Sequence, residues 1–147
     1  MSKKLKVSFF SSSRADYGLL RPLLSICNED PRIDAGIIVS GSHLIKSHGY
    51  TVKEIMNDKF FIQSKIKINI PFDSPSNINQ ALGSALSKYS IALEEIEPNI
   101  AVVLGDRFET FGFAQAAYIL GINILHIHGG EVTNGSLDDG FRHSITK

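Results

Sequence analysis

Short apolar runs alternate along the chain with longer segments whose apolar residues recur every three or four positions. The short runs have the length and composition of buried strands, and five are expected, at residues 6–11, 34–40, 65–70, 100–104 and 122–127. The longer segments predict helices at about residues 17–27, 51–58, 77–96 and 108–120, with a last helix beginning near Leu137 or Asp138. Strands that alternate with helices form parallel βαβ units. We therefore expect an α/β fold, a Rossmann-like parallel sheet with helices on both faces.

The composition is that of an ordinary globular domain. The chain has 147 residues, so we treat residues 1–147 as one Rossmann-like domain. Basic and acidic residues balance at 15 each, which argues against binding to nucleic acid or to an anionic membrane surface. Cys27 is the only cysteine, and the apolar run at residues 7–10 is too short for a signal peptide or a membrane span. We expect a cytoplasmic protein without an internal disulfide.

Ionisable residues follow the strand expected at residues 100–104. Gly105, Asp106 and Arg107 lead from this strand directly into a helix. In open α/β proteins, ligands bind at the carboxyl ends of the strands. Asp106 could simply cap the helix, a contribution of about 1 kcal/mol. Capping does not need the adjacent arginine, which suits a phosphate or a carboxylate, so we favour Asp106 as a proton-handling group and Arg107 as an anion clamp.

Two histidines and an acid end the strand expected at residues 122–127. If the strand continues through His128, then His126 and His128 point to the same face, because side chains alternate along a strand. The glycines at positions 129 and 130 let the backbone approach a ligand closely. The pair could bind a metal, or one histidine could pack while the other does acid–base work. We favour acid–base work, with Glu131 as a further catalytic candidate and no metal.

Two acids stand at the start of the last helix, where they suit the helix dipole. Asp138 and Asp139 are followed one turn later by Arg142 and His143, so one helix face could hold an Asp–Arg or an Asp–His pair. Such a group could be a cap with a surface ion pair, or part of a catalytic site. The spacing alone leaves both interpretations open.

The segment at residues 11–18 lies between the first strand and the first helix, the position of a phosphate-binding loop. It matches neither the P-loop nor the dinucleotide-binding glycine pattern. We assign Arg14 to a diphosphate, the alternative being an arginine on a solvated loop. His43, which follows the second strand, is a weaker candidate at the same edge.

Taken together, these motifs resemble the hydrolysing UDP-N-acetylglucosamine 2-epimerase family of sialic-acid and related nonulosonic-acid biosynthesis. The matching stretches occur in family order and cover nearly all of the chain, at residues 13–18, 41–44, 104–109, 126–131 and 138–147. The resemblance implies a GT-B-like fold, in which the active site lies in the cleft between two Rossmann-like domains. This chain would supply the N-terminal domain, and a nucleotide-binding C-terminal domain would follow Lys147.

The resemblance also implies roles for individual residues. The catalytic group would be Asp106, His128, Glu131 and Asp138. The substrate would be bound by Arg14, His43, Arg107, Arg142 and His143, with the first and third of these near the diphosphate. His128 stands where vertebrate and several bacterial members carry glutamate, which could reflect a different sugar. Asp138 and Asp139 stay alternatives for the catalytic acid.

The implied reaction uses a small-molecule UDP-sugar and no cofactor. A base removes the proton at C2 of UDP-N-acetylglucosamine while UDP leaves C1, and water adds to the resulting glycal to give N-acetylmannosamine. We expect a homo-oligomer of the full-length protein and little activity from residues 1–147 alone. The alternatives are the same reaction on a UDP-2,4-diacetamido sugar, a metal-dependent hydrolase using His126 and His128, and a non-catalytic nucleotide-sugar-binding domain.

Overall fold

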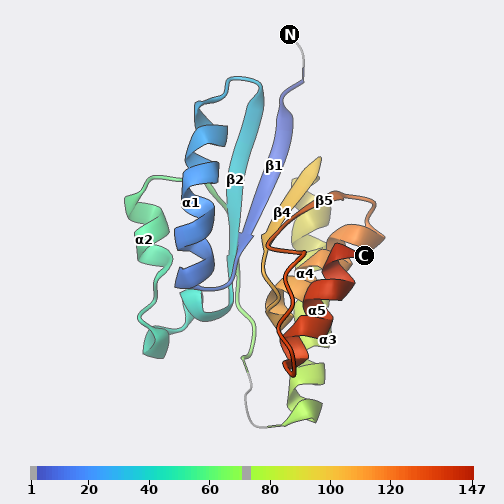
Figure 1. Ribbon diagram of the computed structural model, residues 1–147. Helices are drawn as coiled ribbons and strands as arrows, with labels where there is room; N and C mark the ends of the chain where they lie inside the picture. Colours follow the sequence, from blue (N-terminus) through green and yellow to red (C-terminus); the bar gives the residue numbers. More distant parts are fainter. Residues whose placement is uncertain (1–2, 71–73) are drawn as a thin grey trace.

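Five parallel strands form the centre of the molecule in the computed structural model, which describes residues 3–70 and 74–147 (Figure 1). The strands are β1 (Leu5–Ser11), β2 (Ile33–Ser40), β3 (Ile62–Ile66), β4 (Ile100–Leu104) and β5 (Asn123–Ile127). Their order across the sheet is β3-β2-β1-β4-β5, and all neighbouring pairs are parallel. The chain moves outward from β1 to β3 and then returns to the other side of β1. The strand order therefore reverses between β1 and β4, where open α/β sheets bind ligands.

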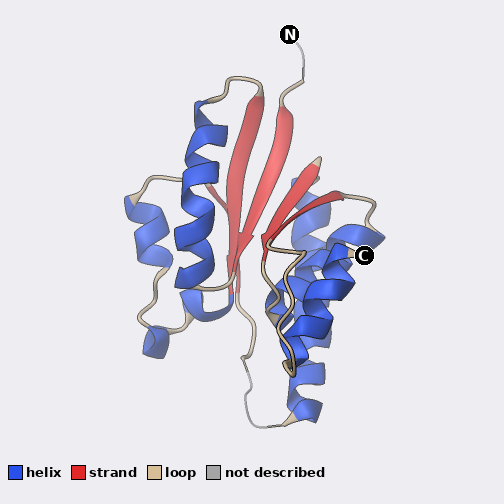
Figure 2. Ribbon diagram, in the orientation of Figure 1, coloured by secondary structure: helices blue, strands red, loops and turns tan. Residues whose placement is uncertain are grey.

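Helices cover both faces of the sheet (Figure 2). They are α1 (Arg14–Glu29), α2 (Val52–Asn57), α3 (Pro75–Ile96), α4 (Phe108–Ile119) and α5 (Leu137–Thr146). Helices α1 and α2 pack on one face, α3 and α4 pack on the other, and α5 lies against α4. Two short 3-10 helices, η1 (Gly41–Leu44) and η2 (Lys46–His48), follow β2. The α/β architecture predicted from the sequence is confirmed.

No helix in the described ranges, residues 3–70 and 74–147, has the length and apolar character needed to cross a membrane.

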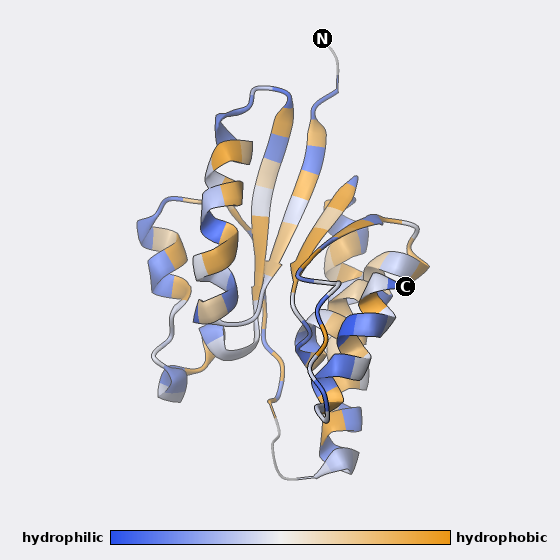
Figure 3. Cartoon of the chain, in the orientation of Figure 1, coloured by the Kyte–Doolittle hydropathy of each residue, from blue (hydrophilic) through white to orange (hydrophobic). Residues whose placement is uncertain are grey.

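Neighbouring residues of the central strands point to opposite faces and build two cores. Phe9 of β1 and Ile37 of β2 pack toward α1 and α2, whereas Phe10 and Ile38 pack toward α3 and α4. Phe10 stacks on Phe113 of α4, with 4.3 Å between the ring centroids. Figure 3 shows the apolar colour concentrated on the strands and on the helix sides that face them. Burial on both faces explains why the central strands are continuous apolar runs in the sequence.

The third strand lies earlier in the chain than predicted. The sequence predicts residues 65–70, but β3 spans Ile62–Ile66. Its partner β2 ends at Ser40, which pairs with Ile66, so the following residues have no neighbouring strand. Ile68 is nevertheless buried in the core on the α3 side. The alternating isoleucines therefore reflect packing of the segment after β3 rather than a continued ladder.

Candidate functional site

The loops that follow β1, β2, β4 and β5 meet at the carboxyl edge of the sheet, the lower edge in Figure 1. Every residue that the sequence predicts to be catalytic or substrate-binding lies in one of these loops or in the helix that follows it. The edge has two sides, one formed by the loops after β4 and β5 and the other by the loops after β1 and β2.

Asp106 is held at this edge by an arginine from a later part of the sequence. Gly105 follows β4 with a φ of +78°, and the N-cap position of α4 is occupied by Arg107, whose side chain makes no capping hydrogen bond. Asp106 instead forms an ion pair with Arg142 of α5, which is 36 positions away in the sequence. The interpretation of Asp106 as a simple helix cap is therefore wrong.

Arg142 joins β4, α5 and the loop between β5 and α5. Its side chain is buried, and its Nη1 donates to Thr133 Oγ1 at 3.1 Å and lies 3.9 Å from Asp139 Oδ1. The same Asp139 oxygen accepts the backbone N–H of Thr133 at 2.7 Å. The structure therefore places Arg142 inside a network of protein contacts and gives it little surface for a substrate.

The two acids in the first turn of α5 have different surroundings. Ser136 caps the helix by accepting the Asp138 N–H at 3.2 Å, and Asp139 lies 3.3 Å from His143 Nε2. Within the described ranges, no hydrogen bond reaches the Asp138 carboxyl. Burial and the nearby charge of Asp106 raise the pKa of Asp138. The acid–base pair expected on this helix face is thus formed by Asp139, and Asp138 is the acid left without a bonded partner.

His126 and His128 do not share a face. β5 ends at Ile127, and His128 has a φ of +59°, which turns the chain out of the strand. The ring nitrogens of His126 lie 2.7 Å from the Gly105 carbonyl and 2.9 Å from Thr146 Oγ1. The two histidines would share a face only if the strand continued through His128, and this condition is not met because β5 ends at Ile127, the residue at which the sequence predicts its end.

His128 pairs with Glu131 instead. The contact runs from His128 Nδ1 to Glu131 Oε1, and the two side chains are 48% and 58% exposed. The hydrogen bond from His128 lowers the pKa of Glu131. Across residues 3–70 and 74–147, no three His, Cys, Asp or Glu side chains are grouped so that they could hold a metal ion. The motif thus holds one paired histidine and acid, His128 and Glu131.

Arg14 stands on the other side of the edge, at the first position of α1. Ser13 caps this helix by accepting the Asp16 N–H at 3.3 Å, so the helix begins at Arg14, three residues before the predicted start. The Arg14 Nε lies 2.9 Å from Glu54 of α2, and the arginine side chain is 72% exposed. Exposed pairs of this kind contribute less than about 1 kcal/mol. Arg14 is therefore held loosely and can exchange partners.

His43 lies inside the protein. It has no exposed surface, and its ring nitrogens lie 2.8 Å from Ser11 Oγ and 2.7 Å from Thr51 Oγ1. Desolvation lowers the pKa of His43, so the ring is neutral at neutral pH. In this arrangement His43 connects β1 to the segment after β2 and has no surface with which to touch a substrate, contrary to the sequence-based expectation.

Glu109 is a charged residue of this edge to which sequence reasoning gave no role. It lies in the first turn of α4 with no exposed surface, and its Oε1 is 3.4 Å from Arg107 Nη2. Burial raises the pKa of Glu109, an effect that the charge of Arg107 opposes. The available signal was an acid at the start of an otherwise apolar helix.

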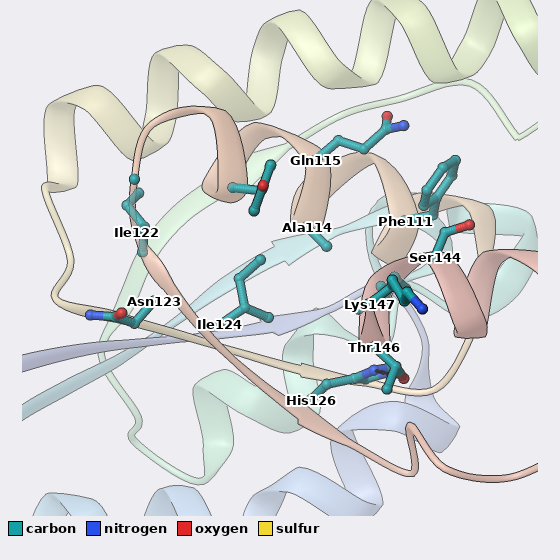
Figure 4. Close-up of a pocket in the computed structure, with 13 residues that line it drawn as sticks. Phe111, Ala114, Gln115, Ile122, Asn123, Ile124, His126, Ser144, Thr146 and Lys147 are labelled. Atoms are coloured by element: carbon teal, nitrogen blue, oxygen red, sulfur yellow. Dashed lines mark hydrogen bonds between the residues drawn. The ribbon is translucent and has the colours of Figure 1, made fainter.

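A separate hollow of about 690 Å³ lies between β5, α4 and α5 (Figure 4). Its walls include Phe111 and Tyr118 of α4, Ile124 and His126 of β5, and Thr146 of α5. Of the candidate residues named from the sequence, His126 lines it, and the residues assigned to catalysis or substrate binding do not. The candidate site is therefore the charged edge and not this hollow.

Acids and cations alternate along the side of the edge that follows β4 and β5. Arg107 is 39% exposed and lies close enough to Asp138 for each to influence the other electrostatically. Arg107 could bind an anionic group of a ligand, and the Asp138 carboxyl could accept a proton from it. Fold and charges together define an open α/β protein that combines acid–base groups with cationic side chains at the point where its strand order reverses.

Comparison with known sequences identifies the family within this class of protein. Residues 25–147 match the UDP-N-acetylglucosamine 2-epimerase family, and the chain belongs to that family. Over all 147 residues it is 37% identical to the GDP/UDP-N,N'-diacetylbacillosamine 2-epimerase (hydrolyzing) of Campylobacter jejuni, covering 38% of that protein. It is 31% identical to the UDP-N-acetylglucosamine 2-epimerase of Neisseria meningitidis over 97% of this chain and 37% of the relative.

Solved structures show the same fold. A crystal structure of a UDP-N-acetylglucosamine 2-epimerase superposes with a TM-score of 0.84 at 21% identity, over 97% of this chain and 39% of the other. The Neisseria meningitidis enzyme bound to UDP-GlcNAc gives a TM-score of 0.81 at 18% identity, over 97% of this chain and 38% of the other. The chain thus has the architecture of the N-terminal half of a GT-B-like fold and spans less than two fifths of the relatives' length.

Proposed function

We propose that the full-length protein is a hydrolysing UDP-sugar 2-epimerase that converts UDP-N-acetylglucosamine to UDP and N-acetylmannosamine. The observation that carries the proposal is the group of Asp106, Arg107 and Asp138 at the reversal point of the sheet, in a chain that belongs to this family. The rest of the protein would supply the second domain of a GT-B-like fold and would close the cleft over this edge. Residues 1–147 alone should therefore release no UDP.

Asp138 is the residue that we assign to the first proton transfer. A proton on carbon is a weak acid, so its base must be placed accurately and have a tuned pKa. The Asp138 carboxyl has no hydrogen bond within the described part of the chain, and burial together with Asp106 raises its pKa. A carboxylate with a raised pKa is a stronger base. In the first step it takes the C2 proton, the C1–O bond breaks with its electron pair leaving on UDP, and a glycal forms.

Arg107 and Arg14 are the groups that we assign to the departing diphosphate. Negative charge builds on UDP as the C1–O bond breaks, and cations placed in advance lower the barrier. Arg107 stands beside Asp138, and the exposed Arg14 stands across the reversal point after β1. The exposed His143 of α5 would bind the sugar nucleotide from the same side.

The second step needs a group on the opposite face of the sugar. Water adds at C1, and C2 is protonated from the face opposite to the first transfer. His128 with its partner Glu131 is the exposed acid–base pair at this edge, and we assign this protonation to His128. Asp106, fixed by Arg142, would keep the electrostatic surroundings of Asp138 constant.

A second candidate substrate is a UDP-2,4-diacetamido sugar. The specific observation in its favour is the identity of 37% to diacetylbacillosamine 2-epimerases of Campylobacter jejuni and Legionella pneumophila, against 31% to the Neisseria meningitidis enzyme. Both sugars undergo the same elimination and hydration. Diacetylbacillosamine differs from N-acetylglucosamine at C4, which carries an acetamido group, and at C6, which is a methyl group, so the choice is decided by groups that contact those two positions.

The test is to offer both UDP-sugars to the full-length protein and to measure UDP release by a coupled assay. We expect release from at least one of the two, with the ratio of kcat/KM identifying the natural sugar. Exhaustive chelation should leave the rate unchanged. Loss of activity on chelation, restored by a metal ion, would establish a metal-dependent enzyme instead. Binding of UDP-sugar without any UDP release would establish a non-catalytic binding protein.

A further inference from the structure

Glu109 is a buried acid to which the proposed reaction assigns no step. Its carboxyl lies where the loops after β1, β2 and β4 come together. A Cβ built on Gly41 would lie 3.3 Å from Glu109 Oε1, so the loop after β2 approaches this carboxyl closely. The same Cβ would lie 2.7 Å from the Ser12 carbonyl, which places the loop after β1 against the same glycine. Arg107 approaches from its own loop, with Nη2 at 3.4 Å. One carboxyl is thus enclosed by all three loops at the reversal point of the sheet.

The hydrogen bonding around Glu109 is incomplete. Within residues 3–70 and 74–147, neither Glu109 Oε2 nor the buried Nε of Arg107 has a partner. A buried charge without its full set of hydrogen bonds destabilises a fold, and an apolar residue of similar size is often better tolerated. Folding alone therefore gives no reason for an acid here.

The neighbours of Glu109 leave Arg107 as its partner. The other titratable groups that influence it are Asp16 of α1 and Tyr89 of α3. The Asp16 carboxylate accepts the Ser12 N–H and hydroxyl at 3.3 and 3.0 Å, and the Tyr89 hydroxyl lies 3.0 Å from Ser40 Oγ. Both are occupied by other bonds. Among the described residues that influence it, Arg107 is the cation toward which the Glu109 carboxyl is directed.

We propose that Glu109 is a positioning residue that fixes the Arg107 guanidinium so that its exposed edge faces the diphosphate of the UDP-sugar. The inference rests on the proposed function and names a residue that this function had not used. A guanidinium carries five N–H donors in a fixed fork, so a carboxylate on one edge leaves the others for a ligand. Fixing the cation in advance removes the reorganisation that would otherwise accompany charge development on UDP.

Glu109 also keeps Arg107 away from the base. Arg107 and Asp138 attract each other, and the charge of Arg107 acts to lower the pKa of Asp138. Without Glu109, the guanidinium would move toward Asp138. Such a movement would misplace the cation and weaken the base at once, so both consequences would appear in kcat.

The test uses Glu109→Gln in the full-length protein, alone and combined with Arg107→Ala, with Glu95→Gln on the exposed surface of α3 as the matched control. We expect Glu109→Gln to lower kcat for UDP release at least tenfold, with a smaller change in KM, while Glu95→Gln stays within twofold of the wild type. In the Arg107→Ala background, Glu109→Gln should change kcat less than twofold, because Glu109 acts through Arg107. Thermal unfolding checks that each variant is folded.

Equal losses from Glu109→Gln in both backgrounds, or a kcat within twofold of the wild type, would overturn the inference while leaving the proposed function intact. A wild-type protein that releases no UDP would overturn the proposed function and this inference with it. Should Glu109→Gln not fold, Glu109→Asp takes its place, since it keeps the charge but withdraws it from Arg107. The same dependence on Arg107 is then required.

Discussion

The loops after β1 and β2 and the loops after β4 and β5 lie at the same edge of the sheet but are built differently. On the first side, buried polar groups satisfy one another: His43 is bonded through both ring nitrogens, and the Asp16 carboxylate accepts two hydrogen bonds from Ser12. On the second side, the polar groups are charged and their pairing is incomplete. The buried side-chain atoms without a partner in the described ranges are Arg107 Nε, Glu109 Oε2 and Arg142 Nε.

We infer from this difference that the loops after β1 and β2 support the site and that the loops after β4 and β5 carry its reactive groups. A fully satisfied polar network holds loops in one arrangement and has little left to offer a ligand. Unmet donors and acceptors cost stability, and they persist in native proteins where a ligand or a reaction uses them. We therefore place the chemistry on the side of β4, β5 and α5, and the support on the side of β1 and β2.

The largest effect should come from Asp138 on the reactive side. Asp138→Asn in the full-length protein removes the proposed base and should lower kcat for UDP release about 10²- to 10⁴-fold, the usual contribution of a positioned acid or base. Asp139→Asn is the matched control, because this neighbouring acid is bonded to Thr133 and His143. A larger loss of kcat for Asp139→Asn than for Asp138→Asn would reverse the assignment.

The next largest effect tests whether Arg142 holds the reactive side together. Arg142→Met leaves Asp106 without its partner, and breaking a largely buried pair costs about 3 kcal/mol. Amide hydrogen exchange of residues 129–146 in the full-length protein should therefore become about a hundredfold faster. Arg32→Met is the control, because Arg32 pairs with Asp30 at an exposed position and the loss should stay below about 1 kcal/mol. Similar hydrogen-exchange rates in both variants would show that Arg142 does not hold this side of the edge together.

Arg14 differs from the other polar groups on the side of β1 and β2, because its side chain is exposed and loosely held. Arg14→Ala should leave stability almost unchanged while raising KM for the UDP-sugar about tenfold, the value of one charge-assisted hydrogen bond. Glu54→Gln removes the same surface pair and keeps the arginine, so its KM should match the wild type. An unchanged KM in Arg14→Ala would remove this residue from the diphosphate site.

The smallest effect concerns the pH dependence of the supporting side. Burial lowers the pKa of His43 below the unfolded value, so its contribution to stability is present above about pH 6.5 and is lost as the pH falls through the folded pKa. Hydrogen exchange in residues 41–52, corrected for intrinsic rates, should accelerate by no more than about tenfold per pH unit, because one proton is involved. His43→Gln should flatten this dependence. An unchanged slope in His43→Gln would assign the pH dependence to another group.

Sequence reasoning placed the candidate residues at the carboxyl edge of the sheet because strand ends and polar residues coincide. The apolar run at residues 100–104 and the polar residues after it follow directly from strand burial and the reversal of strand order. The start of the last helix was also expected near Leu137 or Asp138, and α5 begins at Leu137. Features set by local pattern were therefore predictable, including the fold class itself.

Features set by partners far apart in the sequence were not predictable. The pair of Asp106 with Arg142 depends on how α5 packs against α4, and the burial of His43 depends on what covers η1. The end of β5 before His128 separated two histidines that spacing alone had placed together. Glu109 was missed for the same reason, because its enclosure by three loops exists only in the folded chain.

In the proposed reaction, acids at the carboxyl edge move a proton at C2 while UDP leaves. The most direct measurement is to incubate the full-length protein with its UDP-sugar in deuterated water and to follow the sugar by NMR and mass spectrometry. We expect free UDP together with a 2-epimerised free sugar that carries one deuterium at C2. Release of UDP with a sugar that retains its original hydrogen and configuration at C2 would contradict it.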